Sequence, residues 1–210
     1  MLELPPHHVP RTSLVGSLQG ARVVVVEAAS GFGKSTLTAE LTAGDRVADV
    51  ALTEDAAGPR GLLLPLRRAL RRAGEHEAAA ALGVLTSQTS DALEAMADAF
   101  EQVGPLTLIL DDAHHLGDHA GLLVHLVQHL PRHVRLVIAV RALPPSAERL
   151  RTLPGVAYVD TEDLRFTPTD VAELLRATLV TPSDDVLARR VADATGGWPA
   201  AVTFVGEQLN

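Results

Sequence analysis

Nearly unbroken apolar runs alternate with amphipathic segments along most of the chain. Runs such as Val23–Val26 lack the polar alternation of a strand exposed on one face, so they predict strands buried on both faces, as in a parallel sheet. The runs predict five strands, at 22–27, 46–52, 106–112, 134–141 and 156–160. Apolar residues at helical spacing predict helices at 12–18, at 37–41, at 62–73 with Pro65 near its start or kinking it, from Ser90 or Asp91 to about Val103, and around His125 and His129. This alternation of strands and helices predicts an α/β fold.

Beyond residue 164 the pattern is helical only. Thr167–Asp170 combines an N-cap residue with a proline near the first helical position. A second helix is predicted to begin at Ser183 or Asp184 and to end at Gly196-Gly197, and a third to begin at Trp198-Pro199. Three helices after a sheet predict a small lid. We therefore expect two parts, an α/β core at residues 1–163 and a helical lid subdomain at 164–210.

A glycine-containing loop separates the first predicted strand from the helix that follows it. The loop reads Ala28-Ala29-Ser30-Gly31-Phe32-Gly33-Lys34-Ser35-Thr36, and a strand, a Gly-Lys-Ser loop and a helix in this order are the context of a P-loop. Gly31 and Gly33 let the backbone turn so that successive N–H groups point at phosphate oxygens, beside the positive end of the helix. The strict pattern begins with Gly where this chain has Ala28, a common relaxation. The alternative is an ordinary strand-turn-helix with a chance Gly-Lys-Ser.

Two side chains of the loop have distinct expected roles. Lys34 is expected to reach the β- and γ-phosphates of a nucleotide, and the Ser35 hydroxyl is expected to ligate Mg²⁺. Lys34 is the only lysine of the chain, whose other basic residues are all arginines. A compact ammonium suits a crowded phosphate site better than a planar guanidinium does, so this usage supports the assignment.

Paired carboxylates end the strand predicted at 106–112. An apolar run followed by Asp111-Asp112 is a Walker B pattern, and a buried parallel strand brings these acids to the edge where α/β sheets bind ligands. Asp111 is expected to hold Mg²⁺ opposite Ser35, and Asp112 to orient or deprotonate the attacking water. The alternative is a strand followed by an acidic helix cap. Arg141 ends the next strand and is expected to sense the γ-phosphate, unless it is a surface arginine.

Two other clusters have ordinary interpretations. A basic stripe on the helix predicted at 62–73 is interpreted as a solvated face, with a contact for an acidic partner or another subunit as the alternative; it comprises Arg67, Arg68, Arg71 and Arg72. Histidines recur every four residues at His125, His129 and His133, a spacing that can bind metal. Because Pro131 is expected to end the helix before His133, an ordinary helix surface is favoured over a metal site.

Composition restricts the classes of function. The chain has 210 residues, a formal net charge of −8 and a pI near 5.5, which argues against a surface that binds nucleic acid. The absence of cysteine excludes disulfides and thiolate chemistry. The first residues lack the features of a signal peptide, and no apolar run approaches the roughly 20 residues of a membrane span. We therefore expect a soluble, cytoplasmic protein that does not bind membranes.

In order and spacing, these motifs resemble the nucleotide-binding domain of STAND-class P-loop ATPases, specifically those of large LuxR-type transcriptional activators of the maltose-regulator kind. The resemblance is carried by His8–Arg11, Ala28–Thr36, Leu108–His114, Val134–Arg141 with Pro144-Pro145, Asp163–Thr167 and Thr195–Pro199. It implies a five-stranded parallel sheet of order 5-1-4-3-2 with a helical lid, and an AAA+-like ATP/ADP switch with slow, Mg²⁺-dependent hydrolysis. It also implies that Arg11 lies near the adenine, that Arg141 is the sensor arginine and that Pro199 packs on the base. Trp198 is expected in the lid core or close to the adenine.

The resemblance also bounds the partners. The family's winged helix, helical-repeat sensor and DNA-binding domain have no counterpart in these residues, so we do not expect this chain to bind DNA or an inducer. An adenine nucleotide, other protein domains and self-association in the ATP-bound state are the expected partners. Two alternatives to a regulatory ATPase stay open: a P-loop kinase that phosphorylates a small molecule, and an interaction scaffold that holds ADP without turnover.

Overall fold

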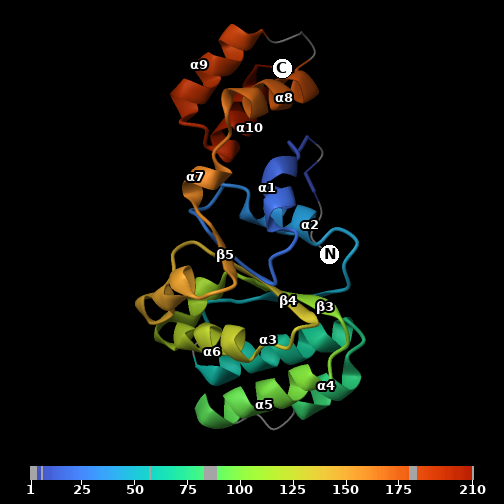
Figure 1. Cartoon of the computed structure of the whole chain (residues 1–210). Coiled ribbons are helices and arrows are strands. Elements are labelled where there is room, and N and C mark those ends of the chain that lie inside the picture. Colours follow the sequence, from blue (N-terminus) through green and yellow to red (C-terminus); the bar gives the residue numbers. More distant parts are fainter. Residues whose placement is uncertain (1–3, 6, 57, 83–88, 180–183, 210) are drawn as a thin grey trace.

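A parallel β-sheet forms the centre of the molecule (Figure 1). The computed structural model describes residues 4–5, 7–56, 58–82, 89–179 and 184–209. The five strands are β1 (Val23–Glu27), β2 (Val47–Ala51), β3 (Leu106–Asp111), β4 (Val134–Val140) and β5 (Val156–Val159). They lie in the order β2-β3-β4-β1-β5, and every pair of neighbours is parallel. Counted from the other edge the order is 5-1-4-3-2, which confirms the expectation.

The apolar run of β1 explains why this strand lies inside the sheet. Its four valines are at most 1% exposed, and their side chains alternate between the two faces. Val23 and Val25 pack into the apolar core on one face, whereas Val24 and Val26 pack into a smaller core on the other. A strand covered on both faces needs no polar alternation, so the continuous run was the correct signal.

Helices cover both faces of the sheet (Figure 1). The larger layer contains α3 (Pro59–Arg72), α4 (His76–Ala81), α5 (Thr89–Glu101), α6 (Gly121–His129) and the 3₁₀ segments η1 (Ala113–Ala120) and η2 (Pro145–Thr152). The opposite layer contains α1 (Thr12–Leu18) and α2 (Lys34–Leu41). The last helices lie beyond the carboxyl edge of the strands, at the top of the figure: α7 (Thr161–Leu164), α8 (Pro168–Thr178), α9 (Asp185–Thr195) and α10 (Pro199–Gln208).

The last three helices have an apolar cluster of their own. It is built from α8, α9 and α10, and one residue from far upstream, Val9, completes it with 3% of its surface exposed. We call α8, α9 and α10 the lid. Its caps are those read from the sequence. Thr167 and Asp170 form a capping box at α8, Asp184 caps α9, and Gly196 ends α9 in the left-handed conformation.

Several boundaries and short elements differ from the sequence predictions. Helix α3 begins at Pro59 rather than Leu62, because proline fits the first helical turn, and Pro65 lies inside the helix. Helix α5 begins at Thr89, so Ser90 and Asp91 are not its N-cap. Helices α4 and α7 and both 3₁₀ segments were not predicted. Each spans eight residues or fewer, too short for a periodic pattern to emerge.

The basic stripe lies on α3, in the layer away from the lid (Figure 1). Arg68, Arg71 and Arg72 are exposed, and Arg72 donates a hydrogen bond to the backbone carbonyl of Asp49 on the edge strand β2. A contact of this stripe with an acidic partner stays a prediction. Across the described ranges, none of the helices has the length and apolar character needed to cross a membrane.

Candidate nucleotide-binding site

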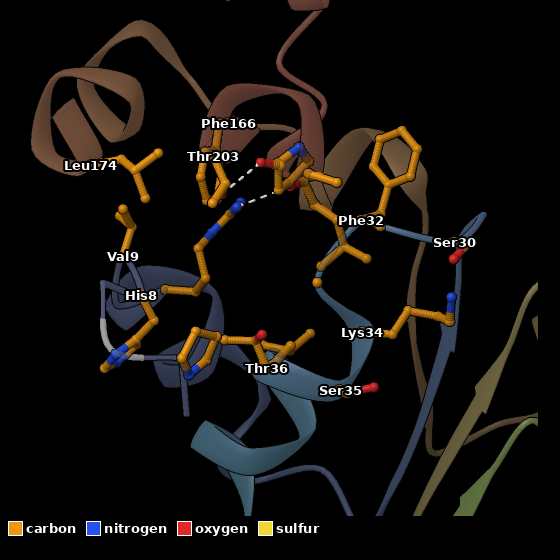
Figure 2. Close-up of a pocket in the computed structure, with 18 of the residues that line it drawn as sticks. His8, Val9, Ser30, Phe32, Lys34, Ser35, Thr36, Phe166, Leu174 and Thr203 are labelled. Carbon is orange, nitrogen blue, oxygen red and sulfur yellow. Dashed lines mark hydrogen bonds between the residues drawn. The ribbon is translucent and has the colours of Figure 1, made fainter. Parts of the chain in front are cut away.

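A cavity of about 550 Å³ lies between the carboxyl edge of the sheet, the N-terminal segment and the lid. Its lining includes every residue that the sequence predicted for the site except Ala28 and Ala29, namely Arg11, Ser30, Gly31, Phe32, Gly33, Lys34, Ser35, Thr36, Asp111, Asp112, Arg141 and Pro199. Figure 2 shows Lys34 and Ser35 on one side of this cavity, and Val9, Phe166 and Leu174 on the other. The cavity therefore has a charged end and an apolar end.

The loop Ala28–Thr36 has the backbone that the glycines were expected to provide. Gly31 and Gly33 have φ angles of +79° and +84°, and Gly33 is the N-cap of α2. The Lys34 ammonium lies across the loop, donating hydrogen bonds to the carbonyls of Ala28 at 2.7 Å and Ala29 at 3.0 Å. The two alanines thus act through backbone atoms behind the cavity wall. Burial lowers the pKa of Lys34, and the nearby Asp111 and Asp112 oppose this shift.

The acidic residues lie at the end of β3. Asp111 is the last residue of the strand, and its Oδ1 accepts a hydrogen bond of 2.9 Å from the backbone N–H of Asp112. Burial raises the pKa of Asp111 above its usual value. Asp112 has a φ angle of +53°, and within the described ranges it alone among non-glycine residues has a positive φ. Backbone held in this sparsely populated conformation is concentrated at functional sites, and Asp112 lines the cavity beside Asp111.

Two basic side chains approach the Asp112 carboxylate. The Arg141 Nε lies 4.0 Å from Oδ1 of Asp112, and the His114 Nδ1 lies 3.8 Å from the same oxygen. The strand order places β4 between β1 and β3, so Arg141 follows the strand that separates the loop from the aspartates. Burial, followed by the neighbouring His115, lowers the pKa of His114. The sequence analysis gave no role to His114, although its place directly after Asp-Asp-Ala was a usable signal.

The donor set at the charged end fits a magnesium nucleotide. The Ser35 hydroxyl and the Asp111 carboxylate line the same cavity, and oxygen ligands of these kinds are what Mg²⁺ prefers. Lys34 and Arg141 supply positive charge at the same end, and the N-terminus of α2 points its free N–H groups into the loop. A triphosphate therefore finds both donors and compensating charge here.

The apolar end is formed by segments far apart in the sequence. Val9 comes from the N-terminal segment, Phe166 precedes α8, and Leu174 and Thr203 lie on α8 and α10 (Figure 2). Sequence reasoning had assigned Arg11 and Pro199 to this end, and Trp198 as one of two alternatives. Leu174 was missed because an apolar residue at helical spacing gives the same signal in a helix core and in a ligand pocket. Val9, Phe166 and Thr203 show no pattern of their own that would indicate a ligand contact.

Arg11 lines the cavity, but its guanidinium binds the chain. It donates hydrogen bonds of 2.9 Å to the carbonyl of Leu164 and 2.6 Å to that of Asp163, and it lies 5.5 Å from the ring centroid of Phe166. Its backbone N–H donates to Glu40 of α2 at 2.9 Å. Arg11 therefore fastens the N-terminal segment to the connection between sheet and lid, at the place where a base contact was expected.

The prediction that Trp198 lies in the lid core was wrong, and its alternative place close to the adenine stays a prediction. Trp198 belongs neither to the apolar cluster of the lid nor to the cavity lining, and 42% of its surface is exposed. Its indole N–H donates to the Ser30 carbonyl at 3.3 Å, and its ring stacks with Phe32 at a centroid distance of 6.3 Å. The Ala200 N–H donates to the Gly31 carbonyl at 3.1 Å. The start of α10 is thus attached directly to the P-loop by these two hydrogen bonds.

The histidine pair of α6 lies away from the cavity. The rings of His125 and His129 stack with centroids 4.0 Å apart, and neither residue lines the cavity. No group of three or more His, Asp or Glu side chains placed to hold a metal occurs within the described ranges.

Comparison with known protein families and sequences places these features in context. The family model described as "AAA domain" matches residues 17–150. The HTH-type transcriptional regulator MalT of Klebsiella pneumoniae is 26% identical over an alignment of 212 positions, which covers 95% of this chain and 23% of the regulator. MalT of Serratia proteamaculans is 25% identical, over 91% of this chain and 22% of the regulator. The chain thus spans under a quarter of the length of the curated relatives it matches.

Solved structures give the same fold. A STAND (signal transduction ATPase with numerous domains) protein with a tetratricopeptide repeat sensor from Pyrococcus horikoshii has a TM-score of 0.67 and 18% identity, covering 94% of this chain and 29% of that protein. A Walker-type ATPase of Pyrococcus abyssi has a TM-score of 0.59 and 13% identity, covering 99% of this chain and 71% of that protein. These matches confirm the P-loop NTPase fold.

Proposed function

The chain belongs to the AAA domain family, and from that premise we propose that it is an ATP-binding regulatory switch that hydrolyses ATP slowly. The observation that supports this proposal most is the composition of one cavity. Its charged end contains the P-loop, both aspartates and Arg141, while its apolar end is completed by the lid. A nucleotide bound there contacts the fixed sheet and the lid at once.

Each residue at the charged end has a proposed role in binding. The triphosphate accepts hydrogen bonds from the loop N–H groups, and Lys34 exchanges its two carbonyl partners for the β- and γ-phosphates. Ser35 and Asp111 hold Mg²⁺, which would neutralise phosphate charge when bound. At the apolar end Pro199 and Phe166 pack on the adenine, and Arg11 supports that wall.

Hydrolysis is proposed to use Asp112 and Arg141. Asp112 orients a water molecule and accepts its proton as the oxygen attacks the γ-phosphorus, while the bond from that phosphorus to the departing ADP oxygen breaks. Arg141, now 4.0 Å from Asp112, stabilises charge on the γ-phosphoryl oxygens. The position of both residues beside the P-loop supports these roles.

Regulation is proposed to act through the lid. The start of α10 donates hydrogen bonds to the carbonyls of Ser30 and Gly31, so a change in loop conformation on exchange of ADP for ATP reaches the lid without an intermediary. We infer a division into a nucleotide-binding core at residues 1–163 and a helical subdomain at 164–210 that contains the lid helices α8, α9 and α10. The moved lid would act on other protein domains or on a second copy of the chain in the cytoplasm, with DNA binding left to other parts of a MalT-like regulator.

The test begins with the nucleotide that co-purifies with the protein. The protein is denatured, the released nucleotide is identified by chromatography, and the stripped protein is titrated with ATP and ADP in a calorimeter. We expect adenine nucleotide in the first step and micromolar or tighter binding in the second. Absence of heat with any adenine nucleotide would refute the proposal. In a single-turnover assay, dependence on an acceptor other than water indicates a kinase, and complete absence of phosphate release indicates an ADP-holding scaffold.

A further inference from the structure

Glu27 occupies a position that the proposed function leaves unexplained. It is the last residue of β1 and directly precedes the P-loop. Carboxylates at strand ends are usually solvated, yet the Glu27 side chain is only 14% exposed. It does not line the cavity, so none of the proposed nucleotide and metal contacts uses it.

Three residues donate hydrogen bonds to this carboxylate. Arg151 Nη2 lies 2.8 Å from each carboxylate oxygen, and Tyr158 donates its hydroxyl proton to Oε2. The Leu143 backbone N–H donates to Oε1 at 3.0 Å. Arg151 lies over the Tyr158 ring at 5.8 Å and within 3.8 Å of Glu148, which is exposed. Burial alone would raise the pKa of Glu27, but the hydrogen bonds from Tyr158, Leu143 and Arg151 together hold it below its usual value.

The contact with Leu143 has a specific consequence for Arg141. The backbone N–H of Ala28 donates to the Val140 carbonyl at 3.1 Å, and the Leu143 N–H donates to Glu27 at 3.0 Å. These two bonds lie on either side of Arg141 in the sequence. Both tie the end of β4 to the residues that begin the P-loop. Arg141 itself is 57% exposed, and its charge contact with Asp112 is 4.0 Å long, so packing alone does not fix its position.

We propose that Glu27 is a positioning residue that sets Arg141 against the P-loop, so that Arg141 can read the γ-phosphate. This inference rests on the proposed function, because it assumes that a nucleotide binds in the cavity. Glu27 acts through the Leu143 N–H, while Arg151 and Tyr158 fix the orientation of the carboxylate. Removal of the carboxylate eliminates the hydrogen bond from the Leu143 N–H, on one side of Arg141. The hydrogen bond from the Ala28 N–H to the Val140 carbonyl, on the other side, remains.

The test compares the affinities for ADP and for a non-hydrolysable ATP analogue, measured by calorimetry on the full chain. ADP reports on the P-loop, whereas the analogue adds the γ-phosphate. Glu27→Ala is expected to reduce the preference for the analogue about tenfold, the size of one lost charge-assisted hydrogen bond, while ADP affinity changes less than about twofold. Glu27→Gln keeps an acceptor for Leu143 and should recover most of the preference.

A double-mutant cycle separates positioning from general stability. Arg141→Ala should reduce the same preference, and adding Glu27→Ala to it should have no further effect, because nothing remains to be positioned. Arg149→Ala is the matched control, since this exposed arginine lies on η2, the segment that also carries Arg151, and contacts neither Glu27 nor the cavity. The Arg149→Ala variant should prefer the ATP analogue over ADP as strongly as the unaltered protein does.

The outcomes distinguish this inference from the proposed function. An unaltered protein that binds no adenine nucleotide refutes the proposed function, and the inference with it. Two results would overturn the positioning role alone, when the unaltered protein binds nucleotide normally. In the first, Glu27→Ala lowers the affinities for ADP and for the analogue equally. In the second, the effects of Glu27→Ala and Arg141→Ala on the preference for the analogue are independent of each other. Where Glu27→Ala does not fold, Tyr158→Phe removes one support of the carboxylate. Tyr158→Phe must then reduce the preference for the analogue by a smaller factor, with little change in the affinity for ADP. An unchanged preference for the analogue counts against the inference.

Discussion

Replacing Gly31 with alanine tests whether the lid is held by the P-loop backbone. A Cβ at this position would lie 2.8 Å from the Cβ of Ala200 and 2.8 Å from the indole nitrogen of Trp198. The backbone at Gly31 also has a φ of +79°. Gly33 provides a matched control, because its φ is +84° and a Cβ there would meet no atom within 4 Å. Both substitutions strain the loop, but only the first collides with the lid.

The expected magnitudes follow from these distances. Left-handed backbone costs an alanine about 1–2 kcal/mol, and this applies to both variants. Overlap with the lid adds about 1–3 kcal/mol for Gly31→Ala alone. If the lid moves away instead, the loss of its two hydrogen bonds to the loop carbonyls costs a similar amount, about 0.5–1.5 kcal/mol each. At 2–4 °C per kcal/mol for a chain of this size, Gly31→Ala should melt about 2–12 °C below Gly33→Ala.

Thermal denaturation followed by tryptophan fluorescence measures both effects. Trp198 is the only tryptophan, so its emission reports on the lid contact without labelling. We expect a red shift of the native emission in Gly31→Ala and none in Gly33→Ala. Equal melting temperatures together with identical emission spectra in the two variants would show that α10 does not press against the loop, and the proposed coupling of loop and lid would lose its basis.

Three further predictions address the charged end and its support. Lys34→Ala should abolish the thermal stabilisation by nucleotide, which at 100 times the Kd amounts to about 2.7 kcal/mol; an unchanged shift on adding ATP contradicts the P-loop assignment. Asp112→Asn keeps a residue that tolerates a positive φ, so it should bind ATP normally while phosphate release falls at least about 100-fold; undiminished release would move the catalytic role elsewhere. Because the pKa of Glu27 is lowered in the folded state, its carboxylate adds stability at neutral pH that is lost as pH falls below about 4.5. The melting temperatures of Glu27→Gln and the unaltered protein, measured between pH 7 and 3, should therefore converge in acid, and a constant difference contradicts this linkage.

Local patterns carried most of the fold prediction. The valines of β1 and the capping box at Thr167 are each complete within a few residues, so the sequence alone could specify them. Parallel pairing then places all strand ends on one edge, which is why Asp111 and Arg141 could be assigned to the P-loop side before their contacts were known. Short elements such as α4 were not predicted, because one or two helical turns are too few for apolar residues to show a helical repeat.

Long-range contacts account for the errors in the site. Trp198 and Ser30 are 168 residues apart, and Tyr158 and Glu27 are 131 residues apart. Nothing near Glu27 in the sequence indicates that an arginine and a tyrosine will enclose it. The same holds for Arg11, whose hydrogen bonds to carbonyls around Leu164 depend on how the sheet and the lid meet. Roles that depend on tertiary packing were therefore beyond a reading of motifs.

The position of Val9 determines the order in which parts of this fold can form during synthesis. It completes the apolar cluster of helices that emerge from the ribosome more than 150 residues later, and Arg11 spans 153 residues to reach Leu164. A nascent chain that has made the sheet but not α8 leaves Val9 exposed and the apolar end of the cavity without a wall. The sheet and P-loop can therefore form first, whereas full enclosure of a nucleotide must wait for the last helix.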